Sequence, residues 1–147
     1  MRYTFVSVCF AALAALNSHG LAADSAAYRD PETGFLFSQY AASYAIGKTV
    51  TFRIAIPSTA MATVPYGAVL QVYSPIELGW TGVAGGGTMV TNPLTVAWAN
   101  ENTAVVTARW ATGHATPTVY TGAALQVFKT GTHTNGIHWL ITVKCAG

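Results

Sequence analysis

The sequence predicts an all-β protein, an antiparallel β-sandwich of immunoglobulin-like architecture. Short segments with apolar residues at alternate positions recur along the chain, and clusters of turn residues separate them. No segment sustains apolar residues at the spacing of a helix. The chain from residue 24 onward has the length of one domain, so we expect a single sandwich there.

About eight segments are predicted to be strands. The clearest is 49–56, where Val50, Phe52 and Ile54 alternate with other residues until Pro57 ends the pattern. Two pairs are predicted to be hairpins, namely 94–99 with 103–110 around Asn100-Glu101-Asn102, and 124–129 with 137–143 across the connection 130–136. The other predicted strands are 34–40, 68–73 and 80–84.

Residues 1–23 are predicted to be a signal peptide. A basic start is followed by an apolar run over 3–16 and then by small residues up to Ala23. The apolar run is shorter than the ~20 residues that cross a bilayer, which argues against a membrane anchor. We therefore expect cleavage after Ala22 or Ala23, secretion to the extracellular space, and no membrane span in the mature domain at 24–147.

The composition excludes several classes of function. Charged residues make up only 8% of the chain and apolar residues 52%, so the chain is not intrinsically disordered. The basic residues are scattered, which argues against nucleic acid as a partner. The five acidic residues are also scattered and form no carboxylate pair of the kind that glycosidases use.

The cysteines and histidines give no complete catalytic or metal site. Cys9 lies in the predicted signal peptide, so Cys145 pairs either between chains or with a cysteine outside this sequence. There is no Gly-x-Ser-x-Gly motif for a nucleophile. His133 and His138 flank the last predicted hairpin and read as surface or strand-face residues, and His114 lies in a predicted exposed turn.

The segment Gly85-Gly86-Gly87-Thr88-Met89 can be interpreted in two ways. It is not a phosphate-binding loop, because no helix is predicted after it. The glycines allow the backbone to bend sharply or to pack closely against a bulky group. Met89 is then either flexible core filling or a thioether ligand for haem iron.

These residues carry a family resemblance. The segment 79–84, running into the glycines and Met89, resembles the haem-binding segment of the cytochrome domain of fungal cellobiose dehydrogenase. The order and spacing of further segments resemble that family from about residue 28 to the end of the sequence. These segments are 30–35, 94–100, 109–113, Pro117 with 120–122, and 138–145.

The resemblance implies a β-sandwich that holds one haem b between a methionine and a histidine, with Met89 as the methionine ligand. It also implies an electron-transfer module with no catalytic residues of its own. A flavin dehydrogenase domain or protein would be the electron donor, and copper polysaccharide monooxygenases would be acceptors. This places the expected role in fungal lignocellulose degradation.

The sequence departs from the family at two points. In the family, the cysteine matching Cys145 is followed by a second cysteine and, later, by the histidine ligand, so we expect a domain that is incomplete at its C-terminus and lacks that second axial ligand. His114 stands where the family usually has tyrosine. It is either a surrogate iron ligand or a changed residue at the edge of the haem pocket.

Two alternatives remain open. The first is a haem-free secreted β-sandwich that binds carbohydrate or protein through exposed aromatic side chains. The second is a copper monooxygenase with an N-terminal histidine ligand, which requires cleavage after Ser18 so that the mature chain begins at His19.

Overall fold

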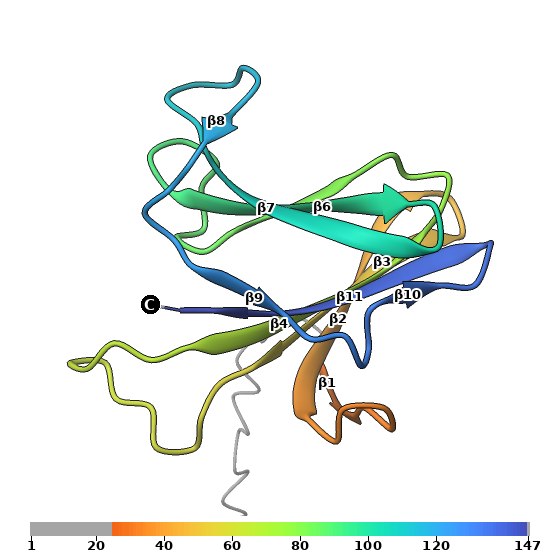
Figure 1. Cartoon of the computed structure of the whole chain (residues 1–147), viewed down its shortest axis with the longest axis horizontal. Helices are drawn as coiled ribbons and strands as arrows, with labels where there is room; N and C mark the ends of the chain where they lie inside the picture. The colour runs from red at the N-terminus through yellow and green to blue at the C-terminus, as the bar shows by residue number, and fades with distance from the viewer. Residues whose placement is uncertain (1–24, 147) are drawn as a thin grey trace, which may run out of the picture.

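The protein is a β-sandwich of two antiparallel sheets, as the sequence predicts (Figure 1). The computed structural model describes residues 25–146, and the predicted signal peptide and His19 lie outside these residues. The described part of the chain has no helix that is long and apolar enough to cross a membrane.

The larger sheet is formed from both ends of the described chain. Its central strands pair in the order β1-β2-β3-β4-β11-β10, and β9 pairs with the other end of β11. Its strands are β1 (Ala26–Arg29), β2 (Leu36–Ala45), β3 (Lys48–Ala55), β4 (Ala68–Pro75), β9 (Leu125–Val127), β10 (His133–Thr134) and β11 (His138–Cys145).

The smaller sheet is formed by the middle of the chain in the order β5-β6-β7-β8. Its strands are β5 (Thr81–Ala84), β6 (Pro93–Asn100), β7 (Thr103–Trp110) and β8 (Thr118–Val119). The predicted hairpin around Asn100-Glu101-Asn102 is confirmed, because Asn100 pairs with Thr103 and Glu101 turns the chain with a positive φ of 52°.

Several strand boundaries differ from the prediction. The pairing of the segments 124–129 and 137–143 is confirmed, although β9 is short and β10 lies within the connection. The first predicted strand, 34–40, continues to Ala45 as β2. The strands β1, β8 and β10 have two to four residues each and were not predicted, because they form by pairing with longer neighbours.

The core lies between the sheets, where large side chains of the larger sheet pack near small side chains of the smaller sheet. On β11, Trp139, Ile141 and Val143 face inward and are fully buried. The smaller sheet presents Ala97 and Ala104 to the same core. Small side chains on one sheet leave room for the tryptophan of the other, which allows close packing between the layers.

The opposite face of the larger sheet holds a buried polar network. The Gln71 side chain is fully buried and donates to the Thr142 hydroxyl (2.8 Å) and to the Asp30 carboxylate (3.2 Å). Its oxygen accepts a hydrogen bond from the Arg53 guanidinium (2.6 Å). Thr142 in turn donates to the carbonyl of Gly131 (2.8 Å), so the network holds the connection after β9 against the sheet.

Asp30 anchors the turn between β1 and β2 in this network. Burial by itself raises the pKa of the Asp30 carboxyl, but hydrogen bonds from Thr33 and Gln71 outweigh that effect and lower the pKa below its ordinary value. A lowered folded-state pKa means that the ionised form stabilises the fold. This contribution is complete above the unfolded aspartate pKa of ~3.9 and is lost as the pH falls through the folded-state pKa.

We therefore expect Asp30→Asn to lower the urea midpoint of unfolding at pH 7, and the difference from the wild type to shrink below pH ~4. The exposed Glu77, which pairs with Lys48 at 2.8 Å, provides the control, and Glu77→Gln should change the midpoint little. A midpoint difference for Asp30→Asn that stays constant with pH would contradict this role.

Candidate functional site

The outer face of the smaller sheet carries a groove of about 960 Å³. This is the upper end of the range for small-molecule sites. Its floor comes from alternate residues of β5 and β6 and from one residue of β7, and its walls come from the connections before and after these strands. The floor residues are Gly82, Ala84, Leu94, Val96, Trp98 and Arg109.

The strand register explains why this face is hollow. Gly82 pairs with Val96, and Ala84 pairs with Leu94. Gly82 and Ala84 add little bulk of their own to the β5 side of the floor, where the Trp80 ring lies over Gly82, whereas β6 supplies bulky apolar groups. Trp80, just before β5, is 65% exposed and lies at the edge of the hollow.

Met89 reaches the groove from the connection between β5 and β6. Its side chain is half-buried and lines the hollow. The turn around it is held by Asn92, whose side-chain amide donates to the Thr88 hydroxyl (2.8 Å) and to the carbonyl of Val90 (3.3 Å). A Cβ atom at Gly86 would collide with that amide, so close packing on Asn92 requires glycine at this position.

A backbone bridge ties this turn to the end of β7. Val90 forms a parallel bridge with Ala111, and the Thr91 amide donates to the carbonyl of Ala111 (2.8 Å). Thr91 adopts a φ of 60°, which is unfavourable for a β-branched residue. Hydrogen bonding to Ala111 thus holds a strained backbone two residues after Met89.

His114 lies in the connection that starts at Ala111. His114, Ala115, Thr116 and Pro117 line the same groove as Met89, and the His114 side chain is exposed, as predicted. In Figure 1, β8 and the connection before it stand above the layer formed by β6 and β7. The structure therefore brings both residues singled out in the sequence, Met89 and His114, to one site.

The other candidate residues lie elsewhere. His133 contacts the Glu32 carboxylate at 2.9 Å on the larger sheet, and His138 stacks on Tyr73 with ring centroids 4.6 Å apart. Cys145 is half-buried at the end of β11 and has no disulfide partner within 25–146. The described residues contain no group of three or more His, Cys, Asp or Glu side chains that could hold a metal ion.

Sequence reasoning gave no individual role to Trp80, Trp98 or Arg109, which also line the groove. A signal for the groove was present in β6. Leu94, Val96 and Trp98 are bulky and apolar, and the residues between them are also small or apolar, so the strand has two faces to cover. One face meets the core, and the other forms the floor of the groove.

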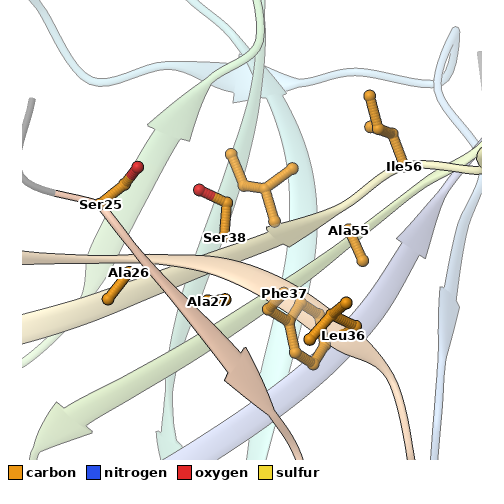
Figure 2. Close-up of a pocket in the computed structure, with 9 residues that line it drawn as sticks. Ser25, Ala26, Ala27, Leu36, Phe37, Ser38, Ala55 and Ile56 are labelled. Carbon is orange, nitrogen blue, oxygen red and sulfur yellow. The ribbon is translucent and has the colours of Figure 1, made fainter. Parts of the chain in front are cut away.

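A second, shallower hollow of about 320 Å³ lies against β1, β2 and the end of β3 (Figure 2). Its lining includes Leu36 and Ile56, which are 58% and 59% exposed, together with small residues from β1. The residues that line this hollow include no sulfur, imidazole or charged group, and its polar side chains are the hydroxyls of Ser25 and Ser38.

A β-sandwich with a thioether and an imidazole in one apolar groove has the features of a cytochrome domain. Residues 28–147 match the family described as the cytochrome domain of cellobiose dehydrogenase, and the chain belongs to this family. The chain is thereby a member of a class of haem-binding electron-transfer domains, and the family implies haem b as its cofactor.

Solved structures agree with this assignment. The cytochrome b domain of pyranose dehydrogenase from Coprinopsis cinerea is 31% identical, with a TM-score of 0.69 over 82% of this chain and 60% of that chain. The cytochrome domain of cellobiose dehydrogenase from Myriococcum thermophilum is 28% identical, with a TM-score of 0.73 over 83% of this chain and 61% of that chain.

A curated relative extends the comparison to a whole enzyme. The chain is 32% identical over 116 residues to the pyrroloquinoline quinone-dependent pyranose dehydrogenase of Coprinopsis cinerea. The match covers 79% of this chain and 15% of that protein, so the chain spans a small part of its relative.

The close approach of Gly86 to Asn92 predicts how the Met89 turn responds to substitution. We expect Gly86→Ala to displace the Asn92 side chain and to destabilise the fold by about 1–3 kcal/mol. The Thr91 amide should then exchange with solvent faster, because its bond to Ala111 depends on the turn. Gly85→Ala is the matched control, since a Cβ there meets nothing within 4 Å. Equal exchange rates in the two variants would contradict the role of Gly86.

Proposed function

We propose that this domain holds one haem b in the groove on the outer face of the smaller sheet and relays single electrons outside the cell. The observation that carries the proposal is the apolar groove lined by the Met89 thioether, in a chain that belongs to the cytochrome-domain family. A bound haem b supplies a carrier that accepts and releases one electron at its iron.

The residues of the groove suit this cofactor. Leu94, Val96 and Trp98 form an apolar floor that would lie against a porphyrin face and exclude water. Gly82 leaves room on β5 for the Trp80 ring to lie close to the backbone, and this exposed indole adds an aromatic wall to the groove. The thioether of Met89 is a known type of axial ligand, and methionine ligation raises the reduction potential relative to other ligands.

The role of His114 follows from its position. Its exposed side chain stands at the mouth of the groove, in a connection tied to the Met89 turn through Ala111. We assign it to the edge of the pocket, where the family resemblance places a tyrosine.

The electron donor in this proposal is a dehydrogenase. The resemblance implies a flavin dehydrogenase, whereas the curated relative is a quinone-dependent one. A cytochrome domain that accepts single electrons could serve either. Copper polysaccharide monooxygenases are the proposed acceptors, with lignocellulose degradation as the setting.

The haem-free carbohydrate-binding alternative is not favoured. The family assignment points to a haem-binding domain. A carbohydrate site built on aromatic side chains also has no need for the Met89 thioether, which the turn around Thr91 holds at the groove.

The iron ligand gives the main test. We expect the chain produced with haem to show a b-type spectrum after reduction, and Met89→Leu to alter that spectrum and speed haem loss, because the variant lacks the thioether. Met61→Leu is the control, since Met61 is 60% exposed and lies outside the groove. The absence of a b-type signal in the wild type would overturn the proposal, and an unchanged Met89→Leu spectrum would remove Met89 as a ligand.

Secretion gives an independent test. We propose that residues 1–23 are removed on export and that the domain occupies 24–147. Mass spectrometry of the secreted protein should give a mature N-terminus at Ala23 or Asp24. A mature chain that begins at His19 would instead support the copper enzyme.

A further inference from the structure

Arg109 occupies an unusual place in the groove. It lies on β7, directly opposite Leu94 of β6 and Val119 of β8, so both of its cross-strand neighbours are apolar. Its side chain is half-buried and lines the groove. It is the one permanently charged side chain among the described residues that form this site.

The Arg109 guanidinium has no partner within residues 25–146, neither a hydrogen bond nor an ion pair nor an aromatic ring. The other two arginines of this region differ. Arg29 donates to the carbonyl of Gly34 (3.2 Å), and Arg53 donates to Gln39 and Gln71 and lies over the Tyr28 ring. Arg109 alone leaves its donors available.

A guanidinium beside apolar side chains loses water when an apolar molecule fills the groove, and this loss is unfavourable unless a counter-charge meets the cation. The guanidinium presents two parallel N–H donors, a geometry that matches a carboxylate. An aromatic or aliphatic occupant of the groove would leave this cation without a partner. The chemistry of the site therefore calls for an occupant that is apolar over most of its surface and carries a carboxylate on the side that faces β7.

We propose that Arg109 binds a carboxylate of the groove's occupant and that, for the haem b proposed above, this group is a haem propionate. The inference rests on the proposed function and adds a positioning residue to it. Arg109 would fix which edge of the porphyrin faces β7, and it would select haem over uncharged apolar molecules.

The test compares ferric haem with its dimethyl ester, in which both propionates are uncharged. We expect the wild-type chain to bind haem about tenfold or more tightly than the ester, as for a hydrogen bond between charged groups. Arg109→Gln should weaken haem binding by a similar factor and leave the ester unaffected. The haem affinity of Arg109→Lys should lie between those of the wild type and Arg109→Gln, because lysine keeps the charge and lacks the paired donors. Lys129→Gln, which removes one charge outside the groove, should leave both affinities unchanged.

The outcomes separate this inference from the proposed function. If the wild type binds neither porphyrin, both the function and the role of Arg109 are overturned. If it binds both equally, or if Arg109→Gln weakens both equally, haem binding stands and the propionate contact is overturned. The comparison of haem with its dimethyl ester uses the wild type alone. It therefore tests the inference even if an Arg109 variant does not fold.

Discussion

The groove depends on the backbone bridge between Val90 and Ala111. Without it, the turn that carries Met89 and the connection that carries His114 would be two separate loops on the smaller sheet. The bridge also holds Thr91 in a backbone conformation that it would not adopt alone. Side chains that are distant in sequence therefore share one site because the Thr91 amide donates to the carbonyl of Ala111 at the end of β7. Asn92 and Gly86 complete this arrangement from the other side of the turn.

The smaller sheet covers the core with one face and forms the groove with the other. Alternation along β6 separates the two tasks: Ala97 faces Trp139 and its neighbours, whereas Val96 and Trp98 face outward. A change of register by one residue would exchange these faces and destroy both layers. The long pairing of β6 with β7, closed by the turn at Glu101, fixes that register.

The sequence supported the fold better than the site. Long strands such as β3 and the β6–β7 hairpin were predictable, because alternation and turn residues are local signals. The strands β1, β8 and β10 were not, because they exist only through their partners. Met89 was singled out through a family resemblance and a run of glycines. Arg109 was not given a role, since one cation within a β-strand has no pattern, and only the three-dimensional structure places it against an apolar surface without a partner.

The larger sheet extends beyond the smaller one, and this has a consequence for the behaviour of the domain in solution. Leu36, Ile54 and Ile56 lie at this side and are each about half exposed or more. Covering such side chains releases ~25 cal/mol for each Å² removed from water. The chain also has few charges to keep copies apart, since only 8% of its residues are charged. Association between copies of the domain is therefore favoured at this side of the larger sheet, and covering Leu36, Ile54 and Ile56 would increase its solubility.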